Sequence, residues 1–274
     1  MSRSDGRLIR SLDPITRFMG YIMKHRWDSC NQITWELEYD KIDAYIKAHK
    51  GQDGPPITLM AIIIAAYVRT ASQFPSVNRF VVNKRLYAHN DVTVSFVTLK
   101  SDWDGTGDQP EALVKIHFTG AETLAEVADK LNTAIIENRA DDANSVEKIA
   151  DSILKLPGLP SAIVGILVWF EKHGKLPKAL IEASPFHCSM FFTNLASIRG
   201  PVLYHHLYEF GTCSTFLALG FSTTRPKSFA IGVTLDERIT GGAGFIRASR
   251  FMEQVITHPE RLEAPPAEVK QDID

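Results

Sequence analysis

The sequence predicts an α/β (α+β) fold in which helices flank one mixed sheet. Apolar residues alternate, as in strands, over residues 33–39, 92–99, 113–118 and 229–235. They recur at helical spacing over residues 15–23, 59–74, 124–135 and 245–256. From residue 33 onward the order begins strand, helix, strand, strand, helix. This order favours a mixed sheet over regular βαβ repetition.

Length, charge and cysteine content bound the class of protein. A chain of 274 residues fits one large domain or two small ones and can bury a sizeable core. A net charge of -2 argues against nucleic acid as a partner, because no overall basic field attracts phosphates. The three cysteines show no C-x-x-C spacing, and no signal peptide is evident. These features predict a cytoplasmic protein.

The N-terminal region is expected to hold a loose basic arm over residues 1–12, followed by a helix. Asp13 is a good N-cap residue, and Pro14 suits the first helical position. The apolar residues after them fall on one face of an amphipathic helix: Ile15, Phe18, Met19, Ile22 and Met23. Its polar side and the arm before it carry a set of basic residues: Arg3, Arg7, Arg10, Arg17, Lys24 and Arg26. This basic side could dock on a membrane surface or a partner, or it could be the solvated side of a helix packed on the domain. We favour the second interpretation.

Two further segments are expected to be helical before the middle of the chain. Thr58 is the predicted N-cap of an apolar helix from Leu59 that ends at Phe74-Pro75. Leu124, Val127, Leu131 and Ile135 share a face of the next helix. Each helix has an apolar side that can cover the sheet.

Residues 140–182 form a region with two predicted helices. Asn144 and Glu147 are suited to the start of the first. The apolar run 162–170 spans roughly 14 Å as a helix, less than half the core of a bilayer, so it cannot cross a membrane. It is predicted to be a buried or subunit-interface helix. The alternative is an interfacial anchor, supported by Trp169 and Phe170 beside charged residues.

Near the C-terminus, a strand runs through a glycine-rich turn into a helix. The strand ends at Leu235, and Asp236, Glu237 and Arg238 follow directly. Gly241, Gly242 and Gly244 are expected to allow a tight turn with positive φ. Pro259 ends the following helix.

This stretch resembles the closing segment of the chloramphenicol acetyltransferases and of the acyltransferase components of 2-oxo acid dehydrogenase complexes. Those families carry H-x-x-x-D-G, or D-H-R-x-x-D-G in the dehydrogenase branch. The chain has Asp-Glu-Arg-Ile-Thr-Gly-Gly over residues 236–242. Asp236, Arg238 and Gly242 match, whereas Glu237 stands at the catalytic His position and Gly241 at the structural Asp position. The resemblance therefore implies the fold but not the standard reaction.

Other segments resemble the same families in the same order. Phe74-Pro-Ser-Val-Asn78 is similar to an F-P-x-x-N motif, and Ser184 to Leu195 is similar to a strand ending in S/T-x-N-L. The resemblance implies a two-layer sandwich over residues 13–262, with 140–182 as an insertion. The remainder, residues 263–274, is a polar tail.

The resemblance also implies where chemistry would occur. In those families two subunits of a homotrimer form each site, and His removes a proton from the acceptor that attacks an acyl-CoA. Thr193, beside Asn194, corresponds to the hydroxyl donor that stabilises the oxyanion, although it could equally be an ordinary strand residue. Glu237 has an ordinary pKa about two units below that of His, and burial could raise it. His187 is a substitute candidate, although a lone strand His is more often structural.

The remaining histidines and cysteines offer little chemistry. His205 and His206 are expected in a strand, where neighbours point to opposite faces. No carboxylate or cysteine lies at ligand spacing, so no metal site is predicted. Cys188 and Cys213 are expected to be small core residues.

Two interpretations of function remain. The first is a CoA-dependent acyltransferase-like protein with a degenerate motif, in which standard acetyl transfer is absent or altered. The second is an active acyl-CoA:acceptor acyltransferase with Glu237 or a His as the base. CoA or acyl-CoA would be a substrate, with no covalently bound cofactor. The expected partners are two further copies of the chain, with weak membrane-surface contact through the N-terminal helix or residues 161–175.

Overall fold

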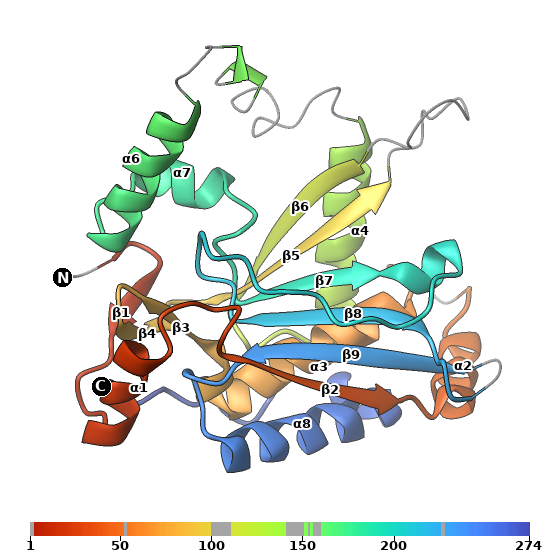
Figure 1. The fold of residues 1–274 in the computed structure, drawn as a ribbon. Coiled ribbons are helices and arrows are strands. Elements are labelled where there is room, and N and C mark those ends of the chain that lie inside the picture. Colours follow the sequence, from red (N-terminus) through yellow and green to blue (C-terminus); the bar gives the residue numbers. More distant parts are fainter. Residues whose placement is uncertain are drawn as a thin grey trace.

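A six-stranded mixed sheet forms the centre of the protein (Figure 1). The computed structural model describes residues 3–51, 54–99, 111–140, 151–152, 154–155, 160–225 and 228–274. The strands, in sheet order, are β2 (Cys30–Glu36), β9 (Phe229–Asp236), β8 (Thr215–Phe221), β7 (Met190–Asn194), β5 (Val92–Leu99) and β6 (Glu111–Phe118). β7 runs parallel to both β5 and β8, and the other pairs are antiparallel. The predicted mixed sheet is confirmed.

Helices cover one face of this sheet and bury the main core. They are α2 (Tyr39–Ala48), α3 (Leu59–Gln73), α4 (Leu124–Ala140) and α8 (Gly242–Thr257). α3 begins as predicted, because the hydroxyl of Thr58 accepts a hydrogen bond of 3.1 Å from the backbone N–H of Ala61. Alternate residues of the central strands, such as Phe192, Leu217 and Val233, face these helices in the core. α2 was not among the predicted elements.

A second sheet of three strands lies beside the first. Its order is β1 (Gly6–Leu8), β4 (Arg85–His89) and β3 (Arg79–Val82), and the 3₁₀ turn η1 (Pro75–Asn78) leads into β3. Residues 6–8 pair with β4, and Ile9 is buried. The prediction of a loose arm over residues 1–12 is therefore wrong for these residues, because backbone pairing to β4 holds them.

The predicted N-terminal helix exists, but it packs through the opposite side from the one we expected. α1 (Pro14–Ile22) is capped by the Asp13 carboxylate, which accepts hydrogen bonds from Ile15 N and Thr16 N. Ile15, Phe18 and Ile22 are 75%, 61% and 60% exposed. Gly20 is buried, and a Cβ atom there would lie 2.9 Å from the carbonyl oxygen of Lys84. The small residue lets this side of α1 approach the body closely, and the apolar side faces outward.

The region predicted as an insertion contains α6 (Pro160–Lys172) and α7 (Lys178–Ala183). The predicted helix start at Asn144 lies outside the described residues. The apolar run 162–170 falls within α6, where Glu171 is the buried residue and Val164, Ile166 and Trp169 are at least half exposed. This helix is therefore not buried within one chain, whereas a subunit interface and an interfacial anchor both stay predictions. Among the described helices, none is long and apolar enough to cross a membrane.

Residues 201–208 form an irregular strap across the sheet face opposite the helices. Val202 N donates to Phe221 O at 2.8 Å, Tyr204 Oη lies 2.6 Å from Thr34 Oγ1, and the ring of His205 stacks on Phe216. A Cβ at Gly232 would lie 2.2 Å from Leu203 O, so glycine permits this close crossing. The predicted strand at His205 and His206 is wrong, because the strap does not pair as a strand.

The polar C-terminal tail after η3 (Pro259–Leu262) returns to the body of the protein. Lys270 N donates to Ser72 O at 2.9 Å, at the end of α3. Asp272 accepts hydrogen bonds from the Arg79 guanidinium at 2.6 and 2.5 Å. These contacts hold residues 270–272 against α3 and β3.

Candidate functional site

The charged residues after β9 form a rigid junction between the main sheet and the end of α1. Asp236 is fully buried, and both of its carboxylate oxygens accept hydrogen bonds from Arg238, at 2.8 and 2.7 Å. Arg238 Nη1 also donates to Met23 O at 3.0 Å. Burial alone would lower the pKa of Arg238, but the hydrogen bonds and charge of Asp236 outweigh it and raise that pKa. The guanidinium therefore pairs with Asp236 rather than with Glu237.

Glu237 is half-buried beside the start of β2. Its backbone N–H donates to Ser29 O at 2.8 Å, and its Oε2 accepts a hydrogen bond of 2.8 Å from Asn31 Nδ2. Asn31 pairs with Leu235 in the sheet, so the strand register fixes this amide beside the carboxylate. Sequence reasoning did not identify Asn31. The available signal was its polar side chain just before the alternating run 33–39, at the start of a predicted strand.

The glycines after Glu237 do not adopt the predicted conformation. Gly241 is the N-cap residue of α8 with φ −67° and ψ 158°, and neither Gly242 nor Gly244 has a positive φ. Gly241 provides no side-chain hydrogen bond to the helix, and a Cβ at Gly241 or Gly242 would meet no atom of the described residues within 4 Å. The positive-φ prediction is wrong. The backbone at Gly241 therefore does not require glycine, and the Cβ of the Asp that the resemblance leads one to expect would fit.

A buried arginine lies near this junction. Arg26 is 2% exposed and donates to the carbonyl oxygens of Tyr208, Glu209, Val81 and Gly211. Its Nε has no hydrogen-bond partner among the described residues. Burial lowers the pKa of Arg26, although the charge of Asp236 opposes this. Sequence reasoning placed Arg26 on a solvated helix side and missed its burial.

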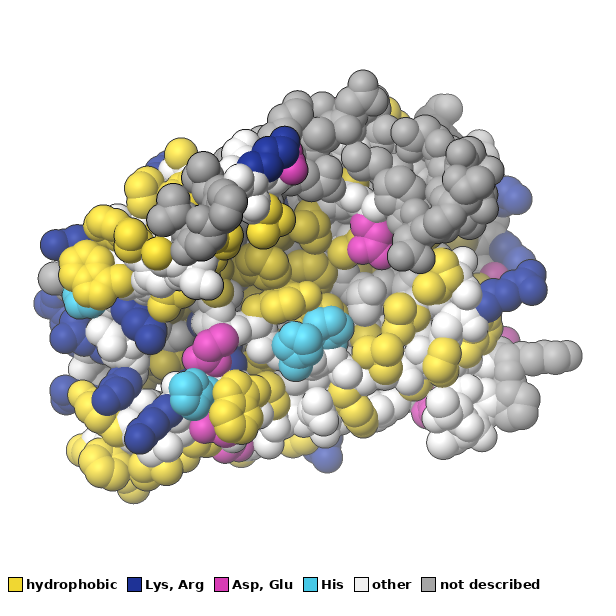
Figure 2. All heavy atoms as spheres, turned by 45° about the horizontal axis from the view of Figure 1, so that its top comes forward, with side chains coloured by type: hydrophobic (Ala, Val, Ile, Leu, Met, Phe, Trp, Pro, Cys, Tyr) yellow, Lys and Arg dark blue, Asp and Glu magenta, His cyan; other side chains and the backbone are white. Residues whose placement is uncertain are grey.

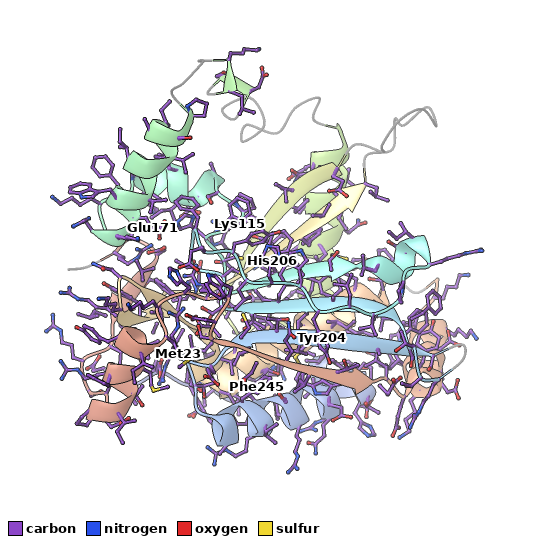
Figure 3. All side chains as sticks on the ribbon, in the orientation of Figure 1. Met23, Lys115, Glu171, Tyr204, His206 and Phe245 are labelled. Carbon is purple, nitrogen blue, oxygen red and sulfur yellow. The ribbon has the colours of Figure 1, made fainter. Side chains whose placement is uncertain are left out.

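Arg26 and Arg238 line a cavity of about 370 Å³. The cavity lies between the residues after α1, the turn joining β3 to β4, the end of α6 and the loop at 209–211. Figure 3 shows Met23 below the three-stranded sheet and Glu171 above it, at the lower end of α6. The strand-to-helix motif is thus next to a small-molecule-sized space.

Thr193 and Asn194 lie far from Glu237 within the chain. Thr193 pairs with Ala218, which pairs with Gly232, five residues before Glu237. Two strand spacings across and five residues along the sheet place Thr193 roughly 19 Å from Glu237. The side chain of Asn194 accepts a hydrogen bond of 3.3 Å from Ser197 N at the start of the turn η2 (Leu195–Ile198). The fold therefore does not bring these residues together with Glu237 in one chain.

His187 is part of a buried ion-pair cluster. Its Nε2 lies 2.5 Å from Glu171 Oε2, and its Nδ1 lies 2.8 Å from Ser184 Oγ. Arg3 Nη2 donates to the other oxygen of Glu171 at 2.9 Å. Burial would raise the pKa of Glu171, but His187 and Arg3 together lower it. Both ring nitrogens are engaged, so this cluster ties α6 to the body and supports the structural role for His187.

The remaining candidate histidines and cysteines contact neighbouring rings or lie in a small core. Within the part of the chain that the structure describes, no group of three or more His, Cys, Asp or Glu residues could hold a metal ion. His205 and His206 stack on each other with ring centroids 4.6 Å apart. Cys188 and Cys213 are fully buried in a small core, as predicted, and burial raises the pKa of Cys188.

Comparisons with known proteins agree on the fold. No protein-family model and no curated protein sequence matches the chain. The catalytic domain of dihydrolipoamide acetyltransferase from Azotobacter vinelandii is similar with a TM-score of 0.57 and 12% identity, over 92% of this chain and 93% of that one. A probable dihydrolipoamide acetyltransferase from Listeria monocytogenes gives 0.53 and 14%, over 95% and 97%. A chloramphenicol acetyltransferase gives 0.54 and 13%, over 92% and 99%.

Proposed function

Because the chain has the fold of the chloramphenicol and dihydrolipoamide acetyltransferases, we propose that it is a CoA-binding, acyltransferase-like protein with altered chemistry. Standard acetyl transfer would be absent or changed. The observation that carries this proposal is Glu237, held by Asn31, at the position where the sequence resemblance leads one to expect a His. A carboxylate is a weaker base than imidazole for an alcohol or thiol. Gly241, in place of the expected Asp, adds no carboxylate to brace the site.

The alternative is an active acyltransferase with a different base. Glu237 supports this alternative better than His187 does, because His187 Nε2 and Nδ1 already contact Glu171 and Ser184. A carboxylate can act as a general base when its surroundings raise its pKa, and substrate binding could supply such surroundings.

A complete site would need a second copy of the chain. Thr193 and Glu237 lie at opposite ends of the sheet, roughly 19 Å apart by the strand register. A trimer, as the resemblance implies, could bring Thr193 of one copy to Glu237 of another. We propose a homotrimer with sites at its subunit interfaces.

Binding of CoA is the first test of this proposal. Calorimetric titration with CoA and acetyl-CoA should give a Kd in the micromolar range, which corresponds to a binding free energy of about −8 kcal/mol. Absence of both heat and thermal stabilisation at millimolar ligand would contradict CoA binding.

Restoring the expected residues tests the chemistry. Glu237→His combined with Gly241→Asp should create acetyl transfer from acetyl-CoA that the natural chain lacks, since it adds a base and a carboxylate brace. The added Asp has room, because a Cβ at Gly241 meets nothing within 4 Å. Glu237→Gln is the matched control. If the natural chain transfers acyl groups and Glu237→Gln abolishes this, the alternative with Glu237 as base is correct.

Contact with a membrane surface is a second candidate function. It is favoured by the outward apolar sides of α1 and α6, which the chain leaves exposed. Co-sedimentation of the purified protein with liposomes would test it.

A further inference from the structure

Two adjoining cavities lie beside the β3–β4 turn and Arg238. The first, of about 430 Å³, is lined by α1, the chain before it and the turn joining β3 to β4. The second is the 370 Å³ cavity beside Arg26, which reaches the end of α6. Val81, Lys84 and Arg238 line both cavities.

The cavities carry a strong excess of positive charge. Arg10, Arg17, Lys84 and Arg85 line the first cavity together with Arg238, and none of the described residues that line it is acidic. Lys24, Arg26 and Lys172 line the second, whose two acidic residues already have partners: Glu171 with Arg3, and Glu209 with Arg26 N. Among the described residues, no carboxylate lies at ion-pair distance from Arg10, Arg17, Lys84 or Arg85. A compact group of unneutralised cations attracts an anion with several charges.

Lys84 is held in an unfavourable backbone conformation at the boundary of the cavities. Asn83 and Lys84 are the two central residues of the β3–β4 hairpin turn, with φ of 49° and 64°. Such turns strongly favour Asn-Gly, because a Cβ disfavours the left-handed region. Lys84 is therefore less stable at this position than glycine would be, and it supplies a cation to both cavities.

Apolar helices flank these cations on both sides. Figure 2 shows two groups of hydrophobic side chains at the left of the molecule, with Lys and Arg side chains among and between them. α1 contributes Ile15, Phe18, Tyr21 and Ile22, and α6 contributes Val164, Ile166 and Trp169. Lys175 lies over the ring of Trp169, with its Nζ 5.9 Å from the centroid. Apolar and aromatic side chains next to cations are typical of helices that lie in a membrane interface.

We propose that this surface binds an anionic phospholipid membrane, with lipid phosphate groups in the two cavities and the apolar sides of α1 and α6 in the acyl-chain boundary. The inference rests on the membrane contact proposed above and names its lipid chemistry. α6 is 13 residues long, about 20 Å, so it can lie in the interface but cannot span the bilayer. A two-fold contact between copies through this surface is disfavoured, because it would place cations against cations.

Vesicle binding by the full chain tests the proposal. The protein should co-sediment with vesicles of phosphatidylcholine plus phosphatidylserine at low salt, more weakly as salt rises, and far less with phosphatidylcholine alone. Lys84→Gly should weaken this binding roughly fivefold, the effect of one lysine at an anionic surface, while raising Tm by about 2 °C. The rise in Tm separates lost binding from misfolding. Phe18→Gln should weaken binding roughly tenfold, because it removes an inserted aromatic side chain.

Matched controls come from the other end of the sheet. Lys50→Ala removes an exposed cation. Ile198→Gln removes an apolar side chain that is 61% exposed. Neither variant should alter vesicle binding. Equal binding to neutral and anionic vesicles would overturn the phosphate sites and leave membrane contact standing. No binding to any vesicle would overturn both, whatever the CoA titration shows. Thermal stabilisation by pyrophosphate without vesicle binding would show a site for a soluble phosphate and overturn the lipid proposal.

Discussion

At the scale of single residues, several buried charges lie in matched groups. Arg238 pairs with Asp236, and Arg3 lies between Asp5 and Glu171 at 2.8 and 2.9 Å. Replacing one residue of such a buried pair with an uncharged residue leaves the other charge uncompensated, which is strongly destabilising. The pKa values of Asp5 and Glu171 are lowered by these contacts, in spite of burial. The stability they provide is therefore present above their ordinary pKa near 4 and is lost as the pH falls further.

His89 lacks such a partner, which predicts acid lability. Its Nε2 is buried without a hydrogen bond among the described residues, and burial lowers the pKa of the ring to about 4. In the unfolded chain this histidine has its ordinary pKa near 6.5. Between pH 6.5 and 4 the unfolded chain therefore binds more protons than the folded protein, so the free energy of unfolding falls as the pH falls. We expect a loss of up to about 3 kcal/mol in the free energy of unfolding over this range. Urea unfolding at a series of pH values measures it.

The variant His89→Phe keeps a ring at this site and removes the titration. Its free energy of unfolding should fall less between pH 6.5 and 4.5 than that of the natural chain. Equal pH slopes for the variant and the natural chain over this range would assign the acid lability to other groups.

At the scale of elements, close approaches of the backbone decide the packing. Gly20 lets α1 meet the β3–β4 turn, and Gly232 lets the strap at 201–208 cross the sheet. Neither glycine has a positive φ, so both are needed for space rather than for conformation. The strap in turn covers a sheet face that would otherwise lie open in this chain.

Gly232→Ala should therefore be destabilising. The new Cβ would lie 2.2 Å from Leu203 O, a backbone atom that cannot move alone. We expect a loss of roughly 1–3 kcal/mol in the free energy of unfolding, as for overpacked sites. Gly242→Ala is the control, because its Cβ meets nothing within 4 Å and it lies at the start of α8. It should be neutral or stabilising by about 0.5 kcal/mol. Equal losses for both variants would contradict this role of the strap.

At the scale of the whole molecule, the candidate site is divided between two ends of one sheet. Glu237 follows the last residue of β9, whereas Thr193 lies near the last residue of β7, which runs in the opposite direction. A single chain cannot use both on one small substrate. Assembly is therefore a requirement of the proposed chemistry.

The proposed trimer predicts a defined mass in solution. Sedimentation equilibrium should give about 92 kDa, three times the chain mass of 30.6 kDa. Dilution should lower this mass only if the subunits dissociate in the measured range. A mass of one chain at micromolar protein would contradict a site shared between copies.

The sequence by itself determined the fold class, most helices and four of the six strands of the main sheet, β2, β5, β6 and β9, because these depend on periodicity and local capping. Asp13 and Thr58 cap the helices that they were predicted to cap, and Pro259 follows the end of α8. It also placed Glu237 at a strand end, since the alternating run stops there.

Only the tertiary structure decided which surfaces these elements bury and which charges pair. Periodicity shows that Ile15, Phe18 and Ile22 share a face, but not that a buried Gly20 makes the opposite side the one that packs. Sequence separation does not predict which charges pair. Arg238 pairs with Asp236 two residues away, and His187 contacts Glu171 sixteen residues away. Arg26 is buried although it follows an exposed helix. Such choices depend on distances of a few ångströms between segments, and a one-dimensional pattern does not contain them.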